Sequence, residues 1–216
     1  MPSRIIPFVN GQIYHVYNRG TEKRRIFESN RDYQRFQKVL NYYQFEGPKP
    51  KFSHFSKTKQ VKLNLSKKIV DLIAYCLMPN HFHLLIKQNR DQGITEIVSK
   101  LSNSYTKYFN TKHNRIGLLF QGEFKAMLIE NDEQLLHISR YIHLNPTSSF
   151  LVKRPEDYEW SSYQEYLGSK YQICEKQQIL ESFKSIEEYK NFVDNQIEYA
   201  KKLELLKHQL IDAELA

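Results

Sequence analysis

Two kinds of hydrophobic periodicity alternate along the chain. Apolar, β-prone runs predict strands, and apolar residues repeated every three or four positions predict helices. Strands are predicted at residues 12–18, 69–77, 81–88 and 118–129. Helices are predicted at residues 31–45, 94–109 and 133–145. This order, β-α-β-β-α-β followed by a further helix, predicts an α+β fold: a ferredoxin-like antiparallel sheet with two helices on one face.

Residues that cap or break elements support these boundaries. Asn30 and Asn131 precede two of the helices and are suitable N-caps. Pro146 disfavours helical geometry at the residue before it, so the third helix is expected to end at Asn145. Turn-forming residues at 78–80 join two apolar runs and therefore predict a hairpin.

The remaining stretches are less regular. Residues 49–65 are basic and poorly patterned, and we interpret them as a loop or loose hairpin that is either solvated or in contact with phosphates. Residues 155–168 are aromatic and rich in turn formers, whereas residues 177–215 are helical and strongly charged. We expect a main domain over residues 1–168 and a helical C-terminal extension over 169–216.

The charge balance indicates which kind of partner the protein binds. The 216 residues include 32 Lys and Arg against 24 Asp and Glu, a formal net charge of +8. This excess favours a polyanionic partner, most simply nucleic acid. The 15 tyrosines and 13 phenylalanines also offer ring faces on which unpaired bases can stack.

Other features exclude whole classes of protein. Cys76 and Cys174 stand far apart, which argues against a zinc knuckle or a disulfide framework. The first residues lack the apolar core of a secretion signal. The most apolar run, residues 69–78, is too short to cross a bilayer. A reduced cytoplasm with no membrane contact is therefore the expected setting.

The strand at 81–88 begins with two histidines separated by one residue. In a strand such residues share one face, so His81 and His83 point the same way, while Phe82 and Leu84 take the other face. Two adjacent imidazoles can hold one metal ion if further ligands converge on them. A pair of ordinary half-buried strand histidines is the alternative interpretation.

A second group of polar residues lies on the helix predicted from residue 133. Tyr141 and Asn145 are four residues apart and share a face, with His137 one turn earlier. If this helix packs beside the histidine strand, a carboxamide and two imidazoles surround one divalent ion, with a phenol next to it. That combination suits attack of a tyrosine on a phosphodiester, with the metal stabilising the charge of the transition state.

Five separated motifs, in order over residues 10–167, resemble one family. His81-Phe82-His83 resembles the histidine-hydrophobic-histidine (HUH) motif of single-tyrosine transposases. The segment 141–146 (YIHLNP) resembles the helix that carries their catalytic tyrosine. Residues 14–20 (YHVYNRG), the turn at 78–80 and residues 120–125 (FQGEFK), with WSSY at 160–163, are similar to the REP-associated tyrosine transposases.

The resemblance implies an enzyme that nicks and rejoins single-stranded DNA, often with hairpin ends, through a covalent 5′-phosphotyrosine. It assigns Tyr141 as the nucleophile and His81, His83 and Asn145 as metal ligands. Mg²⁺ or Mn²⁺ is expected, because carboxamide, phosphate and water oxygens are hard ligands, although two imidazoles alone would equally admit Zn²⁺. Residues 1–168 would form the catalytic domain, and the extension has no counterpart in the resemblance.

The surrounding polar residues receive weaker assignments. His15 either joins the site from its neighbouring strand or makes structural hydrogen bonds, and His143 is expected on the surface, pointing away from Tyr141. Glu123 is expected to bind a base amino group or to pair with Lys125. The residues proposed to contact nucleic acid are Arg19, Arg24, Arg25, Lys100, Lys107, Glu123 and Lys125.

Two rival functions stay open. Ferredoxin-like sheets with exposed aromatic residues also bind single strands without cleaving them, which would make the chain a nucleic-acid-binding module. A metal-dependent hydrolase that uses activated water, with Tyr141 only structural, is the other. In some relatives the tyrosine helix is exchanged between subunits and in others the protein acts alone, so a homodimer and a monomer are both open.

Overall fold

Four antiparallel strands form the centre of the molecule. The computed structural model describes residues 7–46, 51–54, 67–170 and 172–214. The strands lie in the order β2-β3-β1-β4. Their bounds are β1 (Ile13–Arg19), β2 (Val70–Met78), β3 (His81–Gln88) and β4 (Lys125–Leu128). The α+β, ferredoxin-like prediction is confirmed.

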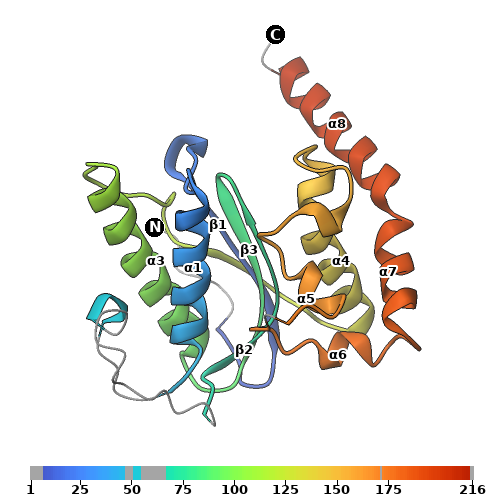
Figure 1. Ribbon diagram of the computed structural model, residues 1–216, viewed down its shortest axis with the longest axis horizontal. Helices are drawn as coiled ribbons and strands as arrows, with labels where there is room; N and C mark the ends of the chain where they lie inside the picture. The colour runs from blue at the N-terminus through green and yellow to red at the C-terminus, as the bar shows by residue number, and fades with distance from the viewer. Residues whose placement is uncertain (1–6, 47–50, 55–66, 171, 215–216) are drawn as a thin grey trace.

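Helices cover both faces of this sheet (Figure 1). α1 (Asn30–Tyr43) and α3 (Gly93–Lys112) pack against each other on one face, as predicted. α4 (Asp132–Ser148) packs on the opposite face against β2 and β3. Successive residues of β3 point to opposite faces, so the ring of Phe82 lies 5.2 Å from that of Phe36 on α1, whereas His83 faces α4.

The C-terminal helices pack against α4 rather than against the sheet. They are α6 (Gln177–Leu180), α7 (Ile186–Asp194) and α8 (Ile197–Glu214), and all three contact α4. Figure 1 shows α7 and α8 running along the outer side of α4. The helix that carries Tyr141 is therefore held between the sheet and the C-terminal extension. The division of domains at residue 168 stays a prediction.

The edge of β2 is closed by the aromatic segment at 155–168, which contains η2 (Pro155–Asp157) and α5 (Tyr163–Tyr166). The amide of Leu77 donates to the carbonyl of Trp160 at 2.9 Å, and the amide of Ser162 donates to that of Tyr75 at 2.9 Å. A covered edge removes the free backbone groups with which another strand would pair. These bonds also bring Ser162 beneath α4.

Two predicted boundaries are wrong. The fourth strand was expected over 118–129, but β4 is limited to Lys125–Leu128 because Gly122 takes a φ of +65°, which interrupts the extended chain. A Cβ atom added at Gly122 would have no atom within 4 Å, so space does not require a glycine here. The positive φ does, because residues other than glycine rarely adopt it. Gly20 and Phe120 still pair in an isolated bridge, directly after the end of β1.

The tyrosine helix continues past its proline. α4 was expected to end at Asn145, yet it extends to Ser148 with Pro146 inside it. The proline only removes its own amide, and the amide of Ser149 still donates to the carbonyl of Asn145 at 3.1 Å. Asn131 caps this helix as predicted, whereas α1 is capped by Ser29, one residue earlier than expected.

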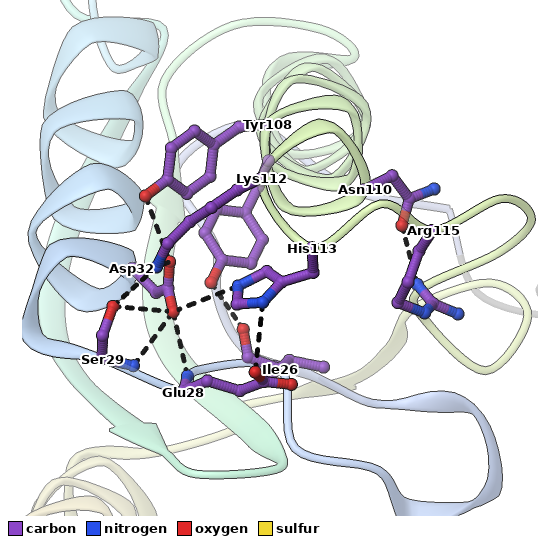
Figure 2. A network of polar contacts seen from close by, with 10 residues as sticks. Ile26, Glu28, Ser29, Asp32, Tyr108, Asn110, Lys112, His113 and Arg115 are labelled. Carbon is purple, nitrogen blue, oxygen red and sulfur yellow. Dashed lines mark hydrogen bonds and ion pairs between the residues drawn. The ribbon is translucent and has the colours of Figure 1, made fainter.

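A buried carboxylate ties the start of α1 to the end of α3 (Figure 2). Asp32 is fully buried and accepts hydrogen bonds from the amides of Glu28 and Ser29 at 3.0 Å each. Its other oxygen receives Lys112 at 2.7 Å and the hydroxyl of Tyr108 at 3.1 Å. These bonds fix the helical layer behind the sheet, on the side away from His83.

Most of the basic segment predicted as a loop or loose hairpin, residues 49–50 and 55–65, lies outside the described residues. In the part of the chain that the structure describes, no helix combines the length and the apolar character needed to cross a membrane.

Candidate active site

The register of the sheet builds one polar row on the face toward α4. Cross-strand partners share a face, and β1 pairs Tyr17 with His83 and Arg19 with His81. On its other side β1 pairs Tyr17 with Lys125 of β4. A cation, a phenol and an imidazole therefore lie side by side across three strands. The alternation of β3 predicted that His81 and His83 share one face of the sheet. That face forms one side of the site.

α4 brings the carboxamide of Asn145 to the two histidines. Asn145 is 5% exposed, and its Nδ2 lies 3.4 Å from Nε2 of His83. Asn145 also hydrogen-bonds His81, whose ring is 4.9 Å from that of His83 and perpendicular to it. The structure thus brings together the three side chains proposed as metal ligands.

Tyr141 stands one helical turn before Asn145, on the same side of α4. Its ring lies 5.4 Å from that of His83, at an interplanar angle of 83°, and 6.1 Å from the ring of His15. The side chain is 42% exposed, so solvent and a substrate can reach it. The phenol predicted to act as nucleophile therefore lies beside the histidine pair.

His15 fixes the orientation of His83 from the neighbouring strand. Nε2 of His15 lies 2.8 Å from Nδ1 of His83, and both rings are buried. Since Asn145 donates to Nε2 of His83, the proton of that ring sits on Nδ1 and is donated to His15. Coordination of a metal at Nε2 needs this same tautomer, with the amide turned to present its oxygen. Of the two roles expected for His15, the structure shows a hydrogen bond to a neighbouring side chain.

Burial keeps all three imidazoles neutral. It lowers the pKa of His15 to about 4 and lowers the pKa of His81. The pKa of His83 falls well below its ordinary value, first through burial and then because a proton on His81 or His15 would repel one on His83. A neutral imidazole is the form that binds a metal ion.

The donor set fits a divalent ion held partly by oxygen. Across the described ranges, no three His, Cys, Asp or Glu side chains gather as a metal site. Nε2 of His15 already meets His83, so that nitrogen is not available to a metal ion. A metal held here would take two imidazoles and the carboxamide of Asn145, leaving positions for water or phosphate oxygens.

A cavity of about 460 Å³ opens in front of these groups. Tyr141, His81 and His83 line it. Three cations surround the same space: Arg19 from β1, Lys23 from η1 (Thr21–Lys23) and Lys125 from β4. The remaining lining residues carry amide, phenol or carboxylate groups: Tyr17, Asn18, Asn80, Gln121 and Glu123.

Only part of the predicted nucleic-acid surface lies at this cavity. Arg19, Glu123 and Lys125 line it, whereas Arg24 and Arg25 follow η1 and are not among its lining residues. Lys100 and Lys107 border a separate cavity of about 610 Å³ on the α1–α3 side of the sheet. Their contact with nucleic acid stays a prediction.

The expectation for His143 is wrong. It was placed on the surface because it points away from Tyr141, but it is fully buried. The direction was correct, and the reason for burial is that α7 and the segment before α5 cover that side of α4. His137, in contrast, is half-exposed and bonded to Arg140 at 2.6 Å.

The C-terminal extension contributes a carboxylate near the site. Glu204 of α8 and Tyr141 line a second cavity, of about 160 Å³, between α4 and α8. The charge of Glu204 also acts on His81 and raises its pKa, against the larger effect of burial. No local sequence signal identifies Glu204, because its place depends on how α8 packs on α4. Tyr17 had a signal, since it shares a strand face with His15.

Comparisons with known proteins agree with this arrangement. Residues 55–145 match the family described as IS200-like transposases. A curated Haemophilus influenzae relative, whose name places it among the REP-associated tyrosine transposases, is 25% identical over 103 residues. That match covers 43% of this chain and 58% of the relative, so the chain spans little more than half of the relative's length.

The fold is shared with a solved structure. A REP-associated tyrosine transposase bound to a REP hairpin superposes with a TM-score of 0.54 and 15% identity, over 80% of this chain and 90% of that one. At this identity the superposition establishes a common fold. The family match over residues 55–145, the curated relative and the shared fold are three separate similarities of this chain to IS200-like and REP-associated tyrosine transposases.

Proposed function

We propose that this protein nicks and rejoins single-stranded DNA in the cytoplasm, with Tyr141 as nucleophile and Mg²⁺ or Mn²⁺ as cofactor. The observation that carries the proposal is the position of Tyr141. A partly exposed phenol lies 5.4 Å, ring to ring, from a buried neutral histidine and opens into a cavity lined by cations. A tyrosine with a purely structural role has no need of either neighbour.

The reaction is a transesterification at phosphorus. The phenol of Tyr141 loses its proton, and its oxygen forms a bond to phosphorus while the bond from phosphorus to the 3′-oxygen breaks. The departing 3′-oxygen takes up a proton, which balances the one lost by the phenol, so the products are a 5′-phosphotyrosine and a free 3′-hydroxyl. Because the phosphate stays a diester, attack by another 3′-hydroxyl reverses the step and joins new ends without ATP.

Each residue of the site has a part in this step. A metal ion bound by His81, His83 and Asn145 would withdraw charge from a non-bridging phosphate oxygen. His15 holds the tautomer of His83 that such binding requires. Arg19, Lys23 and Lys125 would hold the flanking phosphates, and Glu123 would accept a hydrogen bond from a base amino group. An unperturbed phenol has a pKa of about 10, so these neighbours must favour its deprotonated form.

Hairpin DNA is the proposed partner. The structural relative was solved with a REP hairpin, and the cation-lined cavity of this chain suits an unpaired strand beside a duplex. Arg24, Arg25, Lys100 and Lys107 belong to the proposed DNA surface, although they lie away from the cavity. No contact among the described residues favours a monomer over a homodimer.

The test is a denaturing gel of the protein mixed with labelled hairpin DNA and Mn²⁺. Wild-type protein should give a slowly migrating covalent species, and Tyr141→Phe should give none. Tyr17→Phe is the matched control, because it removes a second phenol of the same cavity. It should leave the covalent species in place.

The rival functions predict different gels. Cleavage without a covalent species, unchanged in Tyr141→Phe, would establish the hydrolase that uses activated water. Tight binding of the hairpin with no cleavage in Mg²⁺ or Mn²⁺ would establish the binding module. Either result would overturn the proposal.

A further inference from the structure

The back of the tyrosine helix carries a buried histidine with both ring nitrogens engaged. His143 lies two residues from Tyr141 and two from Asn145, and therefore faces the other way. Its Nδ1 is 2.7 Å from the hydroxyl of Tyr189 on α7, and its Nε2 is 2.8 Å from Oγ of Ser162. The ring is fully buried among aromatic side chains.

The surrounding hydrogen bonds fix where each proton lies. Oγ of Ser162 accepts the amide of Tyr75 at 2.9 Å and donates its own proton to the carbonyl of Tyr75 at 3.1 Å. It can therefore only accept from His143, so the imidazole proton is on Nε2. Nδ1 then accepts the hydroxyl proton of Tyr189. A chain of donors runs in one direction from α7, through α4, to the strand β2.

This chain crosses α4 at the level of the reactive residues. A side chain tip lies about 6 Å from a helix axis, so a rotation of α4 by about 20° would move the Tyr141 hydroxyl by about 2 Å. Displacements of about 1 Å at a reacting group are enough to slow a reaction by about a hundredfold. The contacts that fix the rotation of α4 therefore determine whether the Tyr141 hydroxyl can reach the phosphate.

We propose that His143 and Tyr189 are positioning residues: through their hydrogen bond the C-terminal extension sets the rotation of α4, and so aligns Tyr141 and Asn145 with the histidine pair. This rests on the proposed function. It gives the extension, which lies beyond the residues matched by the family, a part in catalysis. The extension is then a working component of the site.

A second buried phenol provides the matched control. Tyr166 is also fully buried, and its hydroxyl donates to the carbonyl of Ile73 at 2.9 Å. Its ring touches His143, 4.8 Å between centroids, but among the described residues its hydroxyl bonds to β2 and not to α4. Tyr166→Phe therefore removes a comparable buried hydrogen bond, while the link between α7 and α4 stays intact.

The experiment compares single-turnover formation of the covalent species by wild type, Tyr189→Phe and Tyr166→Phe, well below their melting temperatures. Tyr189→Phe should slow it by about 10- to 100-fold, with the hairpin dissociation constant within threefold of wild type. Tyr166→Phe should stay within threefold in both. A Tyr189→Phe rate equal to wild type, or an equal loss in Tyr166→Phe, would overturn the inference.

Crystal structures of the two variants test the inference without any activity. In Tyr189→Phe the separation between the rings of Tyr141 and His83 should depart from 5.4 Å, and in Tyr166→Phe it should not. An unchanged separation in Tyr189→Phe would contradict the positioning role. Absence of a covalent species from wild-type protein would instead overturn the proposed function alone.

Discussion

Nε2 of His15 lies 2.8 Å from Nδ1 of His83, on adjacent strands, and both side chains are buried. The contact determines which nitrogen of His83 is left to face Asn145. Partners of this kind, one step removed from a metal, orient the ligand and are worth about 10- to 100-fold in metal affinity.

Replacement of His15 by phenylalanine should therefore weaken Mn²⁺ binding by about 10- to 100-fold, because the ring shape is kept while the tautomer of His83 is released. Titration calorimetry with Mn²⁺ measures the change. His137→Phe is the control, since that histidine is half-exposed and bonded to Arg140. Wild-type affinity in a folded His15→Phe variant would show that His15 has no such role.

The charge of Glu204 should have opposite effects on the two proposed ligands. Its carboxylate acts electrostatically on His81, so Glu204→Gln should weaken Mn²⁺ binding and strengthen hairpin binding, each by about threefold. Glu198→Gln, in the first turn of the same helix, is the control. Changes of the same sign for both ligands would rule out a direct charge effect.

The cavity cations should appear in the salt dependence of DNA binding. Each lysine that contacts a phosphate of single-stranded DNA contributes about 0.7 to the slope of log K against log salt concentration. Lys125→Ala should lower the slope by that amount, while Lys38→Ala, on the exposed side of α1, should not. An unchanged slope in Lys125→Ala would remove that lysine from the interface.

The same measurement shows whether the lysines that border the separate cavity on the α1–α3 side contact DNA. A loss of about 0.7 in slope for Lys100→Ala or Lys107→Ala would establish that DNA reaches this side of the sheet. An unchanged slope in both would restrict the DNA to the cavity in front of Tyr141.

The buried Asp32 should make the free energy of unfolding fall at acid pH. Burial alone would raise its pKa, but Lys112, the amide of Glu28, Ser29 and Tyr108 together lower it (Figure 2). The unfolded chain then takes up the proton first. The stabilisation is complete above pH of about 4, where an unfolded aspartate ionises, and is lost as the pH falls through the lower folded value.

Asp32→Asn should remove this acid dependence and lower the free energy of unfolding at pH 7 by about 3 kcal/mol, because it leaves Lys112 without its buried partner. Urea unfolding between pH 7 and pH 3 measures both. Asp157→Asn, which removes an exposed pair with Arg154, should resemble wild type. A parallel acid dependence in Asp32→Asn and wild type would show that Asp32 is not its source.

The sequence was most informative where one element determined the outcome. The alternation of β3 predicted a common face for His81 and His83, and the helical spacing of Tyr141 and Asn145 predicted a common side of α4. Each relation depends on a single periodicity, which tertiary packing does not alter. The approach of the two elements to each other was a condition that only the family resemblance implied, and in the structure Tyr141 and Asn145 lie beside His83.

Features that depend on several elements were not predictable in this way. The burial of His143 requires α7 and the segment before α5 to close over α4. The place of Glu204 requires α8 to run back along the same helix. Pro146 was expected to end α4, but a proline removes only one hydrogen bond, and the packing on both sides of this helix outweighs that loss.

Mass spectrometry of the covalent linkage shows directly whether Tyr141 is the nucleophile. After reaction with hairpin DNA and nuclease trimming, trypsin releases residues 141–153, since Arg140 precedes Tyr141 and Lys153 ends the segment, and Tyr141 is the only tyrosine in that peptide. We predict that this peptide carries the nucleotide mass through a phosphotyrosine. A nucleotide found on a peptide that contains Tyr17, or on no peptide while the DNA is cleaved, would contradict it.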